Sequence, residues 1–266
     1  MSYTATFDGH DLSTLFTVGR PERTLVGWEP NLIDGASSAG AFFAGTKAQP
    51  VEVTIPLTTI DGTDLGRMTA LRTLAGWLAV SKPRALVLSD ERVQRNGTTV
   101  PVFRYAVPKG APKIDPAINA DTLSVTFVCA DPLLHSGNGV ESTSYQPFNS
   151  SPKTLTIVGT APTYPIFVLK DVRGDSNGLF RMHVTSGDNA INERITFNAD
   201  PSPAETLNVT VDCTRRRAHT DATEPVAMAL SSGWPRFTGG QTVTLTVEKG
   251  SIDHSTSSVI YNATWW

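Results

Sequence analysis

The sequence is poor in cysteine, in long hydrophobic runs and in net charge. Its 266 residues include two cysteines, Cys129 and Cys213, each within apolar-alternating residues where a thiol packs as a small hydrophobe. We therefore expect two buried free thiols rather than a disulfide or a zinc site. No apolar stretch approaches the roughly 18 residues of a membrane-spanning helix, so no membrane insertion is expected. The formal charge of -3 argues against a basic nucleic-acid-binding module.

Catalytic and cofactor motifs are missing as well. The sequence contains no Gly-x-Ser-x-Gly turn, no dinucleotide fingerprint and no phosphate-binding loop, and its five histidines are dispersed. We therefore expect no enzyme activity, no cofactor and no bound metal. A pair of acidic residues that meets only in the folded protein leaves a hydrolase open as an alternative.

The amino-terminal segment MSYTATFDGHDLSTLF has neither the basic region nor the apolar region of a secretory signal. We therefore expect the protein to fold in a cytoplasm.

Alternating apolar residues occur throughout the chain. In VEVTIPL, the apolar residues Val51, Val53, Ile55 and Leu57 are separated by polar ones, as in a half-buried strand. Similar segments, among them VPVFRYAV, TLSVTFVC, PIFVLKDV, TLNVTV and TVTLTVEK, continue to the carboxyl end. This density of short strands predicts a mainly β architecture.

One segment has a helical period instead. Apolar residues at three- and four-residue spacing predict a helix over about residues 63–80, with an apolar stripe formed by Leu65, Met68, Leu71, Leu74, Trp77 and Leu78. Asp61 or Thr63 can cap its start, and the Lys82-Pro83 step ends it. We expect the stripe to pack against the neighbouring sheet.

Composition changes between Asp131 and Pro152, where Pro, Gly, Ser and Asn follow one another with little periodicity. This predicts a linker over about residues 132–152. The chain would then have a β domain with one helix over residues 1–135 and a β-sandwich over residues 136–266.

Two segments of the first domain carry turn or loop signals. Asn96-Gly97 is a type I′ hairpin signal. The Gly- and Ala-rich segment 31–45 is expected to be a loop, and its Phe42-Phe43 pair is an apolar feature that needs a partner surface.

Spaced motifs along the chain resemble the distal tail proteins of siphophages. The opening YTATFDGHDLSTLF, with Phe7, Gly9 and Leu12, is similar to the start of that family. VTFVCADPLLHS resembles a strand that ends in Asp-Pro at the domain junction, here Asp131 and Pro132. In the second half, SSGWPRFTGGQTVTLTV resembles a Trp, a short gap, a Gly and a final strand, here with Trp234 and Gly239.

The resemblance implies a structural adaptor of the phage baseplate. Proteins of this family form a homo-hexameric ring at the tail tip from their first domain, while a galectin-like β-sandwich projects outward. In such a ring, the loop around Phe42-Phe43 and the hairpin at Asn96-Gly97 would be the candidates for contacts between subunits. The ring joins the tail-tube protein to the tail-associated hub protein, receives receptor-binding or fibre proteins, and leaves a channel for DNA. The chain would then be a virion protein of the tail tip, assembled in the host cytoplasm, without sequence-specific nucleic-acid binding.

Two alternatives remain beside the hydrolase. A carbohydrate-binding β-sandwich for host receptor recognition would use Trp234 as a platform for a sugar ring. A related tail-tube or hub protein would share the β-rich ring domain and differ in its partners.

Overall fold

The computed structural model describes residues 3–34, 41–95, 98–114, 122–137, 143–188, 190–199, 207–221, 224–229 and 231–266. By its internal contacts the chain divides into two compact units, Met1–Glu141 with Trp266 and Ser142–Trp265. The division into domains at residues 135 and 136 stays a prediction.

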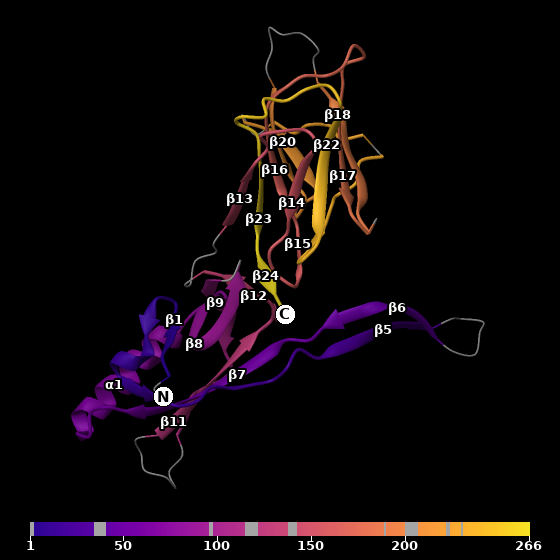
Figure 1. The fold of residues 1–266 in the computed structure, drawn as a ribbon. Coiled ribbons are helices and arrows are strands. Elements are labelled where there is room, and N and C mark those ends of the chain that lie inside the picture. Colours follow the sequence, from indigo (N-terminus) through magenta and orange to yellow (C-terminus); the bar gives the residue numbers. More distant parts are fainter. Residues whose placement is uncertain are drawn as a thin grey trace. The chain divides into compact units, whose positions relative to one another are not determined.

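The first unit is built on a curled antiparallel sheet, drawn in indigo to magenta in Figure 1. Its central order is β2-β1-β8-β9-β11-β7-β3; in addition, β4 pairs with β7, β10 with β11, and β12 with β9. The strands are β1 (Ala5–Phe7), β2 (His10–Asp11), β3 (Phe16–Val18), β4 (Glu22–Arg23), β7 (Val51–Thr59), β8 (Arg84–Arg95), β9 (Thr98–Pro108), β10 (Lys113–Ile114), β11 (Thr122–Cys129) and β12 (Leu134–Ser136). A 3₁₀ helix, Leu12–Thr14, follows β2.

The alternation of apolar residues decides which face of each strand is buried. In β7 the apolar residues Val51, Val53 and Ile55 are all buried, as the sequence predicts. Phe7 of β1 and Phe127 of β11 meet in the same core, with ring centroids 4.8 Å apart. The core of the first unit therefore forms where these strands turn their apolar faces toward one another.

The predicted helix is present as α1 (Asp64–Leu78). Thr63 is its N-cap and accepts a hydrogen bond from the backbone N–H of Gly66, while Asp61 accepts from the N–H of Thr63. The apolar stripe packs only in part: Leu74 is buried, but Leu65 is 79% exposed and Met68 49% exposed. The expectation that the whole stripe packs on the sheet is therefore wrong for Leu65 and Met68.

Segment 31–45 contains strands rather than a loop. β5 (Trp28–Asp34) and β6 (Ala41–Ala48) form a separate two-stranded antiparallel sheet, with Leu32 paired to Phe43. The sequence analysis missed them because nearly all of their described side chains are exposed, so no apolar face marks the strand period.

The second unit is the expected β-sandwich (Figure 1). One sheet has the order β13-β23-β16-β19-β20 and the other β14-β22-β17-β18, and β15 pairs with β21. The strands are β13 (Thr143–Pro147), β14 (Lys153–Thr156), β15 (Pro162–Thr163), β16 (Ile166–Val172), β17 (Leu179–Ser186), β18 (Asn192–Asn198), β19 (Leu207–Asp212), β20 (Arg217–Thr220), β21 (Phe237–Thr238), β22 (Thr242–Lys249), β23 (Ser258–Asn262) and β24 (Thr264–Trp265). Phe167 of β16 and Phe180 of β17 belong to one core, so the two sheets pack face to face.

The predicted linker is not free of regular structure, because β12 and β13 both lie within it. Cys129 and Cys213 are free and buried, as predicted, and burial raises the pKa of the Cys129 thiol to about 11. None of the helices in the described part of the chain has the length and apolarity needed to span a bilayer.

Candidate assembly surfaces and pocket

The hairpin β5–β6 exposes large apolar side chains. Leu32 is 56% exposed and Phe43 66% exposed. Trp28 is also exposed, although its ring lies edge-on to that of Trp266, with centroids 4.8 Å apart. Leu32 and Phe43 are directly opposed across the two strands, so their side chains share one face of the ribbon. We call Trp28, Leu32 and Phe43 the hairpin surface. An isolated two-stranded ribbon is marginally stable in water, so this surface is suited to contact another protein.

A second exposed apolar surface surrounds the start of α1. It consists of Ile60, Leu65 and Met68, all of them exposed, and we call it the helix surface. Leu71 and Trp77, farther along α1, pack against the core and hold the rest of the helix in place. The first unit therefore presents two different apolar surfaces.

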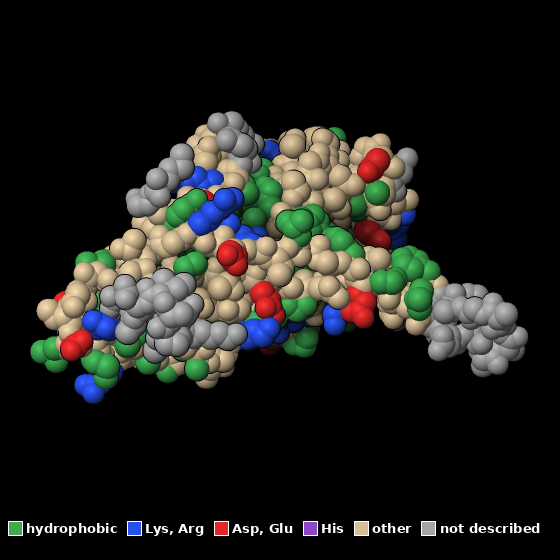
Figure 2. All heavy atoms as spheres, turned by 90° about the horizontal axis from the view of Figure 1, so that it is seen from below, with side chains coloured by type: hydrophobic (Ala, Val, Ile, Leu, Met, Phe, Trp, Pro, Cys, Tyr) green, Lys and Arg blue, Asp and Glu red, His purple; other side chains and the backbone are tan. Residues whose placement is uncertain are grey.

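Charge is distributed without a large area of one sign on the face shown in Figure 2, where acidic and basic side chains lie among hydrophobic ones. The basic run at residues 215–217 lies at a turn that leads into β20, and the Arg215 side chain lies 3.8 Å from the Asp212 carboxylate.

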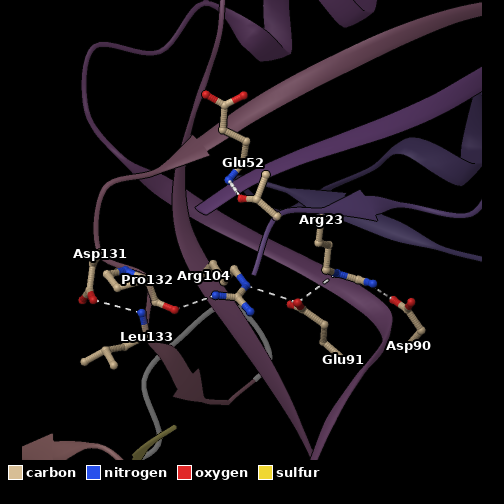
Figure 3. Close-up of polar contacts among 9 residues, drawn as sticks. Arg23, Glu52, Asp90, Glu91, Arg104, Asp131, Pro132 and Leu133 are labelled. Atoms are coloured by element: carbon tan, nitrogen blue, oxygen red, sulfur yellow. Dashed lines mark hydrogen bonds and ion pairs between the residues drawn. The ribbon is translucent and has the colours of Figure 1, made fainter. Parts of the chain in front are cut away.

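A buried ionic cluster lies where β4, β8 and β9 meet (Figure 3). Arg104 of β9 donates through Nε to Glu91 of β8 at 3.1 Å, and Arg23 Nε of β4 lies 3.0 Å from the same carboxylate oxygen. Arg23 also pairs with Asp90. Because Arg104 and Glu91 are both buried, each charge depends on the other for compensation.

The same cluster holds the chain as it leaves β11. Arg104 Nη1 donates to the carbonyl oxygen of Pro132 at 2.6 Å. Asp131 accepts from the N–H of Leu133 at 3.1 Å and lies 3.2 Å from His135 Nε2. Burial alone would raise the pKa of Asp131, but the hydrogen bonds from His135 and Leu133 together hold it below its usual value.

A protein-family model matches part of the first unit. Residues 7–129 match the family model described as the phage tail protein RIFT-related domain. The matched residues all lie in the first unit. No curated protein is a significant match.

The fold of the whole chain matches a distal tail protein. The crystal structure of Dit (gp 19.1) from phage SPP1, described as a paradigm of the hub adsorption apparatus of phages that infect Gram-positive bacteria, aligns with a TM-score of 0.69. The alignment covers 100% of both chains at 16% identity. Two structures of the phage p2 baseplate in its activated conformation align at TM-scores of 0.40 and 0.37, with 8% and 7% identity, over 98% of this chain and 97% of the other chain in each case. The predicted resemblance to siphophage distal tail proteins is therefore confirmed.

The motif residues of the first half lie near the two ends of the region that matches the family model, residues 7–129. Phe7 and Leu12 are buried in its core, and Gly9 has a φ of 81° in the turn between β1 and β2. Asp131 and Pro132 follow β11, and the Pro132 carbonyl accepts a hydrogen bond from Arg104 of the ionic cluster. Phe7 and Leu12 therefore stabilise the core of the first unit, and the functional assignment of all five residues stays a prediction.

The predicted contact residues of the first unit are only partly described. Phe43 belongs to the hairpin surface, whereas only the backbone of Phe42 is described, paired with Ile33. Asn96 and Gly97 lie outside the described residues, between Arg95 of β8 and Thr98 of β9, which pair with each other.

In the second unit, Trp234 and Gly239 lie on either side of β21. Trp234 is half-buried: it packs against the core on one side and lines a cavity of about 340 Å³ together with Glu193, Arg236 and Gln241. At Gly239 a Cβ atom would lie 2.2 Å from the carbonyl carbon of Gly159, so the two backbones approach too closely for any side chain.

The sequence analysis did not identify Arg23, Glu91 or Arg104. The alternation of β8 is interrupted by a register shift between Val87 and Arg92, which makes room for Glu91 to be buried. A usable signal was the charged Arg104 in the middle of the apolar segment VPVFRYAV. Among the described residues, no group of three or more His, Cys, Asp and Glu side chains could hold a metal ion.

Proposed function

We propose that the chain is a structural adaptor of a phage tail tip, whose first unit closes into a homo-hexameric ring. The RIFT-related domain over residues 7–129 and the fold shared with Dit from phage SPP1 support this proposal. The single observation that carries it is the pair of exposed apolar surfaces on the first unit.

A ring of identical subunits needs two different surfaces on each subunit, because each head-to-tail contact joins one surface to the other kind. The hairpin surface and the helix surface meet this requirement. An unsupported β-ribbon such as β5–β6 gains partners for its Leu32 and Phe43 side chains when it lies against a neighbouring subunit. In this proposal the hairpin surface reaches the neighbour, and the helix surface completes the circle.

The ring would join the tail-tube protein on one side to the tail-associated hub protein on the other, and leave a channel for DNA. A net charge of -3 suits such a channel, because a strongly basic wall would hold the phosphates of the DNA. The second unit would carry receptor-binding or fibre proteins. The protein would be assembled in the host cytoplasm and end in the virion.

The role is structural rather than enzymatic in this proposal. A carboxylic acid that acts as general acid needs a raised pKa. Among the described residues, every carboxylate whose pKa is shifted has a lowered pKa. Most of these carboxylates accept hydrogen bonds from residues of their own turns. Asp253, for example, accepts from the hydroxyls of Ser255 and Thr256.

Light scattering and negative-stain imaging of the purified protein test the ring. The wild type is expected to have six times the chain mass at high concentration and to show rings with an open centre. The double variants L32S/F43S and L65S/M68S are expected to be monomeric with unchanged thermal stability, because they remove exposed apolar area from the contact and none from the core.

The variant Y145S is the matched control, since Tyr145 is an exposed aromatic residue of β13 in the second unit. It should assemble like the wild type. A wild type that stays monomeric at every concentration would overturn the ring. A wild-type ring that both double variants still form would refute the assignment of its contacts.

A further inference from the structure

The cavity beside Trp234 is a candidate ligand site that the tail-tip role does not use. Its walls come from β15, from the start of β18 and the residues before it, from β21 and the segment before it, and from Gln241 just before β22, so it is a local feature of the second unit. At about 340 Å³ it has the size of a small-molecule pocket rather than of a packing defect.

The indole is held in place by the backbone on both sides. Pro235 restricts Trp234 to an extended conformation. Before it, the N–H of Gly233 donates to the carbonyl of Arg194 at 2.8 Å, and Ser232 Oγ donates to the carbonyl of Thr196 at 2.8 Å. The segment that carries Trp234 is therefore tied to β18, and the part of the ring that does not pack on the core lines the cavity.

A carboxylate and a guanidinium flank the ring without neutralising each other. The Glu193 carboxylate lies directly against the backbone of Gly233, where a Cβ atom would meet its Oε2. Within the described residues no hydrogen bond or ion pair of the Glu193 or Arg236 side chain is found. Arg236 lies over the Tyr164 ring, 5.8 Å from its centroid, which orients the guanidinium.

The fourth polar group is an oriented amide. Gln241 Nε2 donates to Asp188 at 2.9 Å, which leaves its Oε1 as an acceptor without a partner. Hydrogen bonds from Ser186 and from the N–H of Ala190 hold the pKa of Asp188 below its usual value, so this carboxylate is charged when it holds the amide.

We propose that this cavity binds a neutral saccharide. The apolar C–H face of a sugar ring can stack on the indole, while its hydroxyls donate to Glu193 and accept from Arg236. An apolar ligand would leave both charged groups unsatisfied. Pro162 and Ile191 supply further apolar wall. The site is independent of the ring, so its failure would leave the tail-tip role unaffected.

The full chain, labelled on lysine, is screened on an array of mono- to tetrasaccharides, and the glycans it retains are titrated by calorimetry. The wild type is expected to retain at least one neutral glycan with millimolar affinity or better. W234A should lose binding at least tenfold through loss of stacking. E193Q should weaken binding about tenfold, because a charged acceptor makes stronger hydrogen bonds than a neutral one.

E193Q keeps the size of the side chain, so weaker binding by this variant would come from the lost charge and not from misfolding. Y145A is the control, because it removes an exposed aromatic residue of the same unit that does not line the cavity. It should bind like the wild type. The proposal fails if the wild type retains no neutral glycan, or if W234A and E193Q bind as tightly as the wild type.

Discussion

Arg104 donates one hydrogen bond to the Pro132 carbonyl at 2.6 Å and, through Nε, a second one to Glu91. The guanidinium therefore joins the centre of the first unit to the segment that leaves its last long strand. Glu91 is shared with Arg23, so two cations compensate one buried carboxylate (Figure 3). The Asp-Pro step identified from the sequence thus has a structural partner far from it in the chain.

The variant R104M is expected to lower the free energy of unfolding by about 3 kcal/mol, because it leaves Glu91 with only one cation and removes the donor to Pro132. Chemical denaturation measures the change. R215M is the matched control, since the Arg215 side chain is 66% exposed in its pair with Asp212, and it should stay within about 0.5 kcal/mol of the wild type.

A double variant that removes both Arg104 and Glu91 separates the effect of an uncompensated charge from the effect of lost packing. R104M/E91M should recover part of the loss, because no buried charge is then left without compensation. If R104M is as stable as the wild type, the ionic cluster does not stabilise the first unit.

The lowered pKa of Asp131 makes the stability of the first unit depend on pH. Its pKa is lower in the folded protein than in the unfolded chain, so its stabilising contribution is present above about pH 4 and is lost as the pH falls through the folded pKa. D131N should therefore melt at a lower temperature than the wild type at pH 7, and the difference should shrink below pH 4. Calorimetric scans at pH 7, 5 and 3 measure this. A difference that is constant with pH would assign the effect to packing alone.

The sequence predicts those elements whose apolar residues follow one period. In β7 and α1, burial of one face requires the observed spacing, so both elements were found with nearly correct bounds. The exposure at the start of α1 was not predicted, because the apolar spacing is the same for side chains that pack on the core and for those that do not. Leu65 and Leu74 look alike in the sequence, yet only Leu74 is buried.

The sites depend on groups that are far apart in the sequence. Arg23, Glu91 and Arg104 lie on three strands, and a bulge in β8 removes the periodic signal at Glu91. At the cavity of the second unit, Trp234 was identifiable as an unusual aromatic residue. Its neighbour Glu193, however, comes from β18, far away in the sequence. Only the register of the strands brings such residues together.

The turn at Gly239 allows a direct test of close backbone contact in the second unit. A Cβ atom there would lie 2.2 Å from the Gly159 carbonyl carbon and 2.5 Å from the Thr160 nitrogen, and neither backbone atom can move away as a flexible side chain could. G239A should therefore lower the free energy of unfolding by about 3 kcal/mol. Gly187 is the matched control, because a Cβ there meets nothing within 4 Å, and G187A should change stability by less than about 0.5 kcal/mol. Calorimetric melting of both variants beside the wild type measures the effect. Equal melting temperatures for G239A and G187A would show that the two backbones can separate without cost, and that the Trp-to-Gly spacing of this segment has no packing role.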